Sequence, residues 1–207
     1  MADIPGFAVT ENDKQIERRV MGEVRMGPAP ADGAPAVLTG HAAVFNSPAD
    51  LGFFREQIAP GAFTDAIQKD DVRALIDHDS RLVLGRNRAG TLRLAEDQTG
   101  LAVEIDAPDT SYANDLLTSM KRGDITQMSF GFRALVEKWD ETQDPPLRTL
   151  EKVELFDVSP VTFPAYADTQ ISVRAFQHAG AILKQSTIAV RAARMRMRQA
   201  MMERGIR

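Results

Sequence analysis

Four short strand-like segments follow one another between residues 72 and 107. The last of them has the clearest pattern, because the apolar residues Leu101, Val103 and Ile105 alternate with small or acidic ones. A period of two places apolar side chains on one face of a strand and polar side chains on the other. Four consecutive strands of this kind predict a sheet or a barrel.

Other parts of the chain extend this pattern. Segments with alternating or β-branched residues predict further strands at Gln15–Met26, Ala36–Phe45, Gln127–Lys138 and Arg148–Phe163, the last interrupted at Pro160. Helical spacing predicts a short helix at Ala62–Lys69 and a longer one at Ser111–Arg122, which Gly123 is placed to end. We therefore expect an α+β fold with an antiparallel β-barrel-like core, surrounding helices and a C-terminal helical tail.

Charge is distributed unevenly along the chain. The whole chain has a formal net charge of −4, yet residues 189–207 hold six arginines and one acidic residue. Val190, Ala193, Met197 and Met201 lie near one face of a helix in this tail. Such a tail could be a solvated helix, a basic arm for nucleic acid or a docking helix for a partner. It holds no aromatic residue that could stack on bases, so we expect no nucleic-acid partner.

Composition excludes several classes of function. The chain has no cysteine, so it has no disulfide, thiolate nucleophile or cysteine-based zinc site. No His, Asp and Glu run has metal-ligand spacing, and we expect neither metal nor cofactor. No apolar run approaches the ~18 residues of a membrane span, and residues 1–13 lack the layout of a secretion signal. We expect a soluble intracellular protein with no membrane partner.

His78 is the histidine best placed for catalysis. It follows a predicted strand, Val72–Asp77, at the point where a rigid element gives way to a loop. Such a histidine is more often a structural residue. His41 lies within a predicted strand and is interpreted as a core histidine, and His178 precedes an Ala-Gly segment and shows no functional signal.

Ser129 is the candidate nucleophile. It stands in a predicted strand between Met128 and Phe130, with Gly131 two residues later. A serine hydroxyl needs a neighbouring base and N–H donors for the oxyanion, and small residues nearby allow a peptide to approach. The SFGF segment lacks the GxSxG elbow, so the signal from this segment alone is weak.

Asp157 is the candidate third residue. It lies between Phe156 and Val158 in a predicted strand, where burial of a carboxylate requires a partner. That partner is either His78, which Asp157 would orient, or an arginine in a salt bridge. Glu154 is the alternative third residue and is expected to point to the opposite face of the strand.

Several motifs occur together in one order along the chain: GHAAVFN (40–46), IAPGAF (58–63), LIDHD (75–79), LGR (84–86), GTLRL (90–94), residues 100–132 ending in MSFGF, and VELFDVSPVTFPAYADTQI (153–171). In this order and spacing, the sequence resembles the HK97-type phage prohead protease family over residues 17–175. The family is similar in fold to the herpesvirus assemblins.

The resemblance implies a serine endopeptidase that acts on the major capsid protein and its scaffold or delta domain, and on itself, during procapsid maturation. It implies His78 as base, Ser129 as nucleophile and Asp157 as acid, with aspartate where the family often has glutamate. It also implies a location inside the procapsid in the host cytoplasm, and a dimer. The corresponding division is a flexible segment 1–16, a protease domain 17–175 and a basic helical tail 176–207, which binds a partner or is removed by self-cleavage.

Two points stay open at this stage. The oxyanion donors are expected to be backbone amides, either in Leu84–Arg88 or in the segment after Ser159. The rival functions are a non-enzymatic capsid-assembly or scaffold protein and a metal-dependent hydrolase, of which the second has little support in the sequence.

Overall fold

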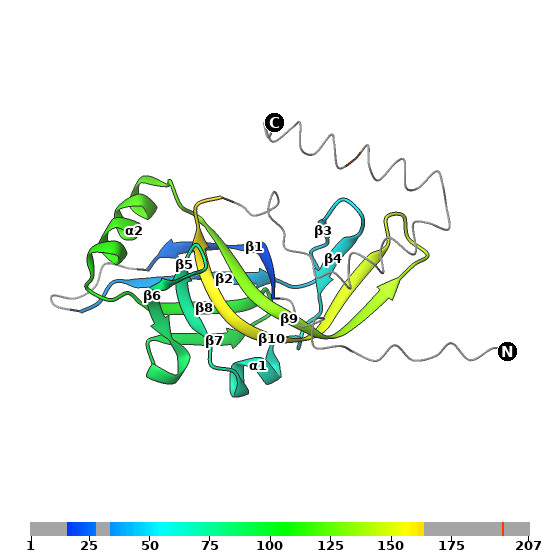
Figure 1. The fold of residues 1–207 in the computed structure, drawn as a ribbon, viewed down its shortest axis with the longest axis horizontal. Helices are drawn as coiled ribbons and strands as arrows, with labels where there is room; N and C mark the ends of the chain where they lie inside the picture. Colours follow the sequence, from blue (N-terminus) through cyan, green and yellow to red (C-terminus); the bar gives the residue numbers. More distant parts are fainter. Residues whose placement is uncertain (1–15, 28–33, 164–195, 197–207) are drawn as a thin grey trace.

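The computed structural model describes residues 16–27, 34–163 and 196. Strands dominate these residues (Figure 1). They are β1 (Glu17–Met26), β2 (Val37–Val44), β3 (Ala49–Asp50), β4 (Arg55–Ile58), β5 (Arg73–Ile76), β6 (Asp79–Arg86), β7 (Leu92–Glu96), β8 (Gly100–Asp106), β9 (Gln127–Asp140) and β10 (Leu147–Val161). The strands predicted from the sequence are all present, with ends that differ by a few residues.

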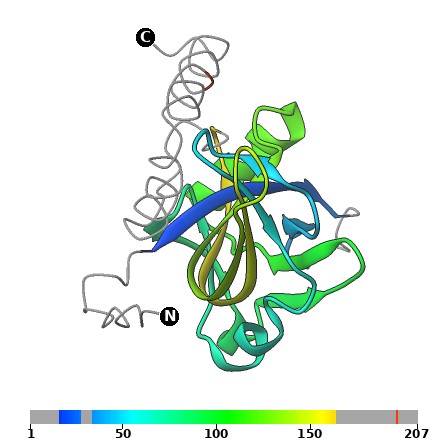
Figure 2. The same ribbon diagram turned by 90° about the vertical axis from the view of Figure 1, so that its right-hand side faces the viewer.

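The strands form one sheet in the order β3-β4-β10-β9-β1-β2-β8-β7, and the β5–β6 hairpin joins it through β10. β9 and β10 make a long curved hairpin, seen nearly end-on in Figure 2. Most neighbouring strands are antiparallel, but β10 pairs in parallel with β4 and then with β5. The sheet is therefore mixed.

The predicted fold class is wrong in two respects. The end strands β3 and β7 of this order do not pair with each other, so the sheet does not close into a barrel. Within the described ranges the α-helices of more than one residue are α1 (Thr64–Lys69) and α2 (Ser111–Arg122), too few to surround the sheet. The described part of the chain is therefore mainly β.

Helix α2 begins and ends where the sequence predicts. The Thr110 side chain accepts a hydrogen bond from the Ala113 amide at the first turn. Gly123 ends the helix with φ of 83°, a left-handed conformation that glycine adopts without strain. Leu116 and Met120 are on the buried side, so α2 packs its apolar face on the sheet.

A hydrophobic core lies against the middle of β9. Phe130 and Phe132 are fully buried with ring centroids 4.9 Å apart, and Phe63 packs edge-on against Phe130 at 5.6 Å. Phe63 directly precedes α1. This packing fixes the part of β9 that also contains Ser129.

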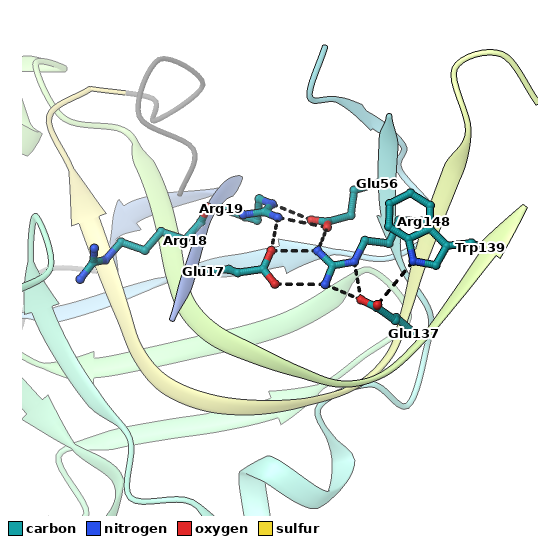
Figure 3. Close-up of polar contacts among 7 residues, drawn as sticks. All are labelled: Glu17, Arg18, Arg19, Glu56, Glu137, Trp139 and Arg148. Atoms are coloured by element: carbon teal, nitrogen blue, oxygen red, sulfur yellow. Dashed lines mark hydrogen bonds and ion pairs between the residues drawn. The ribbon is translucent and has the colours of Figure 1, made fainter. Parts of the chain in front are cut away.

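A buried charged cluster joins the start of β1 to β4 and to the β9–β10 hairpin (Figure 3). The Arg148 guanidinium donates to Glu17, Glu56 and Glu137, and Arg19 donates to Glu17 and Glu56. Arg148, Glu17 and Glu56 are at most 1% exposed. Burial opposes charge on Arg148, but the three carboxylates outweigh it and raise its pKa further above its ordinary value.

Among the described residues, no helix has the length and apolarity needed to cross a bilayer. The predicted segment 1–16, except its last residue, and the predicted tail 176–207, except Arg196, lie outside the described residues. The guanidinium of Arg196 lies 3.3 Å from the Asp144 carboxylate, in the connection between β9 and β10.

Candidate active site

Ser129 lies in the middle of the sheet, on a strand that is paired on both sides. Its partner on β1 is Val20 and its partner on β10 is Ser159. Residues that are paired across an antiparallel ladder project to the same face. Ser129, Ser159 and Asp157 therefore share one face, because Asp157 is two residues from Ser159 on β10 and pairs with Gly131.

A β-bulge at Phe156 turns Asp157 onto this face. Leu155 pairs with Phe132, and Asp157 pairs with Gly131, so Phe156 is the extra residue on β10. In a regular strand without a bulge, Asp157 would share a face with Leu155, which packs in the core. A one-residue shift reverses the faces of every later side chain. The bulge therefore brings Asp157 and Ser159 beside Ser129 and away from the apolar core.

Gly131 makes room for the Asp157 carboxylate. A Cβ atom at residue 131 would lie 2.4 Å from Asp157 Oδ1. No side chain fits at that distance unless the carboxylate moves. The structure therefore gives a reason for a glycine at residue 131, and its expected role in letting a peptide approach Ser129 stays a prediction.

His78 lies in a two-residue turn between β5 and β6, not at the start of an open loop. Asp77 and His78 have φ of 48° and 58°, both in the left-handed region. Positive φ at both central residues defines the type I′ hairpin turn, whose twist matches that of the flanking strands. Ile76 pairs with Asp79 directly across the turn. The turn therefore holds the backbone of His78 in one conformation.

The imidazole of His78 bridges Ser129 and Asp157. His78 Nε2 lies 2.7 Å from Ser129 Oγ, and His78 Nδ1 lies 2.5 Å from Asp157 Oδ2. Ser159 Oγ donates to the same carboxylate oxygen at 2.7 Å. With the proton on Nδ1, His78 donates to Asp157 and Nε2 can accept the Ser129 hydroxyl proton. The arrangement has the connectivity of a serine, histidine and acid triad.

The other acids near His78 have different partners. Asp79 binds Arg81 through both carboxylate oxygens, and this hydrogen bonding lowers the pKa of Asp79 to about 2. Asp77 accepts two hydrogen bonds from Thr162. Glu154 forms an ion pair with Arg133 at 2.5 Å. Of the two acids considered in the sequence, Asp157 contacts the histidine and Glu154 binds an arginine.

His41 is a surface residue, so its interpretation as a core histidine is wrong. Its side chain is 28% exposed, and Nε2 lies 2.8 Å from Asp97 Oδ2. This hydrogen bond, together with backbone bonds from Gly100 and Thr99, lowers the pKa of Asp97 to about 2. His178 lies outside the described residues.

Four of the amides predicted to bind the oxyanion are already engaged. In the segment Leu84–Arg88, the N–H of Arg86 donates to Thr91, that of Asn87 to Val72 and that of Arg88 to Asn87. After Ser159, the N–H of Thr162 donates to Asp77. Each of these four amides must give up an existing partner before it can stabilise an oxyanion.

The triad is covered in this structure. Ser129 has no exposed surface, and the side chains of His78 and Asp157 are each 10% exposed. A covered site strengthens the hydrogen bonds within it, because water does not compete for the same groups. A polypeptide can reach Ser129 Oγ only when the groups that cover it move aside.

Comparison with known proteins places the chain in a family. The family model described as caudovirus prohead serine protease matches residues 23–182, more than half of the chain. The chain belongs to the caudovirus prohead serine protease family. It is thus a serine protease of phage capsid assembly, and the non-enzymatic alternative raised by the sequence does not agree with this membership.

One solved structure is similar to this protease. It is the capsid assembly protease gp21 of bacteriophage T4, with 11% sequence identity, a TM-score of 0.47 and coverage of 74% of this chain and 100% of that chain. No curated protein gives a significant match.

Sequence reasoning missed three residues around the triad of this protease. Ser159 follows Asp157 by two residues, and this spacing alone could have placed both on one face of a strand. Asp77 and Thr162 are far apart in the sequence, and nothing in either segment predicts that they meet.

In the part of the chain that the structure describes, no group of three or more His, Cys, Asp or Glu side chains is arranged to hold a metal ion.

Proposed function

We propose that this protease is an endopeptidase that cleaves the scaffold or delta domain of the major capsid protein, and its own chain, inside the procapsid. Ser129 is the nucleophile, His78 the general base and acid, and Asp157 the residue that orients His78. The observation that supports this assignment most directly is the hydrogen-bonded series from Ser129 Oγ through both ring nitrogens of His78 to Asp157.

The first step is acylation of Ser129. His78 Nε2 takes the hydroxyl proton as Ser129 Oγ attacks the carbonyl carbon of the scissile peptide bond. The imidazolium then gives this proton to the departing amine, which leaves an ester between Ser129 and the substrate. Water, activated by the same nitrogen, hydrolyses the ester and restores the serine hydroxyl.

Asp157 acts through His78 and does not contact the reacting bond. A carboxylate beside Nδ1 keeps the proton on that nitrogen, so Nε2 stays available as the base, and it stabilises the imidazolium formed during each step. The hydrogen bond from Ser159 fixes the orientation of the carboxylate. Aspartate has a shorter side chain than glutamate, and the 2.5 Å separation supports its reach to His78.

The test is co-expression with the major capsid protein carrying its scaffold domain. We expect the wild-type chain to release scaffold-domain fragments and fragments of itself, and Ser129→Ala to release neither. Ser80→Ala is the matched control, because Ser80 is an exposed serine two residues after His78. Mass spectrometry of the fragments locates the cut bonds, and light scattering of the same preparations measures the expected dimer.

Two outcomes oppose the proposal. Identical fragments from the wild type and Ser129→Ala would remove Ser129 as the nucleophile. Fragments that depend on Ser129 but never arise from the scaffold domain would leave the serine protease in place and reject the proposed substrate.

A further inference from the structure

The turn that carries His78 is bound to the end of β10 by three hydrogen bonds of Asp77. The Asp77 carboxylate accepts from the Thr162 amide at 2.7 Å and from the Thr162 hydroxyl at 2.8 Å. The Asp77 amide donates to the Pro160 carbonyl at 3.0 Å. We call these three bonds the Asp77 latch.

The Asp77 latch joins the β5–β6 turn to β10 beyond the last residue pair between β5 and β10. β5 pairs with β10 through only two residue pairs, Arg73 with Asp157 and Ala74 with Val158. The turn lies beyond these pairs, at the level of Pro160 and Thr162. In the part of the chain that the structure describes, the hydrogen bonds of Asp77 hold this turn against the end of β10, beside the bond from His78 itself to Asp157.

This position links the latch to the geometry of the triad. The His78 imidazole must meet Asp157 on β10 and Ser129 on β9 at the same time. Asp77 is the residue directly before His78, and Thr162 follows Asp157 on the same segment of chain by five residues. A displacement of about 1 Å at a catalytic group can lower a rate by about 10²-fold, so the anchor that sets the position of His78 also affects the rate.

We propose that Asp77 is a positioning residue, which holds the His78 turn against β10 through Thr162. This inference rests on the proposed function of His78 as the base. It assigns Asp77 no contact with the substrate. The second aspartate beside His78 has a different role, since Asp79 is committed to Arg81.

The test uses the full chain and three variants. Thr162→Val keeps the shape of the side chain and removes the hydroxyl, while Thr162→Ser keeps the hydroxyl. Thr162 is exposed, so neither change opens the core. Asp77→Asn removes the carboxylate charge and one acceptor oxygen while the turn keeps its length.

The first readout is the rate at which a fluorophosphonate probe labels Ser129, followed by mass spectrometry. We expect Thr162→Val and Asp77→Asn to label about 10-fold more slowly, because His78 would be displaced by less than about 1 Å. Thr162→Ser should label within about twofold of the wild type. Equal labelling of all four chains would overturn the latch as a positioning device.

The second readout is the proton NMR signal of His78 Nδ1–H, which requires neither a reaction at Ser129 nor a substrate. We expect the far-downfield signal of the bond to Asp157 to weaken in Thr162→Val and Asp77→Asn and to persist in Thr162→Ser. An unchanged signal in all variants overturns the latch. A wild-type chain that is not labelled at Ser129 would contradict the proposed function, and this NMR comparison would still decide on Asp77.

Discussion

The β9–β10 hairpin holds two buried polar networks along its length. One joins Ser129, His78 and Asp157 near the start of β9 and the end of β10. The other joins Arg148 and Glu137 of the hairpin to Glu17, Glu56 and Arg19 near its far end (Figure 3). Both remove charged or polar groups from water, and both satisfy them with short hydrogen bonds.

The two networks differ in whether a proton can move through them. Arginine stays protonated at every pH that proteins tolerate. Arg148 and Arg19 also lower the pKa of Glu17, so near neutral pH these groups keep their charges and serve to hold strands together. The triad contains an imidazole whose two nitrogens exchange donor and acceptor roles, and it sits in a turn at the edge of the sheet. Burial alone therefore does not distinguish a catalytic network from a structural one. A catalytic network is distinguished by a group that can both accept and return a proton.

The largest effect that we expect is a loss of catalytic activity on substitution of Asp157 in the triad. Asp157→Asn should lower kcat/KM for a cleaved capsid peptide by about 10⁴-fold, because an amide no longer selects the tautomer that leaves Nε2 free. The fold should be retained, since asparagine fits the space above Gly131. Peptide cleavage assays and urea unfolding measure the two quantities.

Glu154→Gln is the matched control for Asp157→Asn. It removes a carboxylate three residues away on the same strand, from a partly exposed pair with Arg133. We expect its kcat/KM to stay within a few-fold of the wild type. Should Glu154→Gln be the variant that loses activity, Asp157 is not the third residue of the triad.

The contrast also explains how far the sequence could lead. Local patterns predicted the strands and helix α2, because alternation, helical spacing and Gly123 act within a few residues. The parallel pairing of β10 with β4 and β5 depends on contacts more than 80 residues apart, as in Asp157 with Arg73. No local period encodes such contacts, and the expected antiparallel, barrel-like core was wrong for this reason.

Pro160 and Phe156 are two single residues of β10 whose structural effect was not predicted from the sequence. Pro160 was expected to interrupt the strand, yet β10 continues to Val161. Proline is tolerated there because the pairing of β10 with β5 ends at Val158, and the Pro160 carbonyl accepts a hydrogen bond from the Asp77 amide. Across the bulge at Phe156 the apolar positions shift from Val153 and Leu155 to Val158. Glu154 and Asp157 therefore share one face, and the expectation that they point to opposite faces is wrong. His78, Ser129 and Asp157 could be named from motifs, but their meeting could not be derived from spacing.

The next expected effect concerns stability and tests the charged cluster. Arg148→Met should lower the free energy of unfolding by about 3–5 kcal/mol, because it removes a buried cation from the buried carboxylates of Glu17 and Glu56 and from the partly buried Glu137. The folded fraction should still label at Ser129 at the wild-type rate. Urea unfolding and probe labelling measure these separately.

Arg133→Ala is the control for Arg148→Met. It breaks the pair with Glu154, in which the two side chains are 25% and 35% exposed, and should cost no more than about 1 kcal/mol. Equal losses for the two variants would show that burial of the charged cluster gives it no special weight in stability.

The smallest expected effect is a pH dependence of stability that comes from the cluster. Burial alone would raise the pKa of Glu17, but hydrogen bonds and charges from Arg148 and Arg19 outweigh it and lower the pKa below its usual value of 4.5. A lowered pKa means that the folded state favours the ionised carboxylate. Its contribution to stability is then fully present above about pH 4.5 and is lost as the pH falls through the folded-state pKa.

Glu17→Gln removes this one titrating group. Its free energy of unfolding at neutral pH should be lower than that of the wild type, and below pH 4.5 it should fall less steeply, by at most about 1.4 kcal/mol per pH unit for one proton. Urea unfolding at a series of pH values from neutral to acidic measures both slopes. Parallel slopes for the two chains would mean that Arg148 and Arg19 do not lower the pKa of Glu17 in the folded state. The ionised Glu17 carboxylate would then make no contribution to the loss of stability in acid.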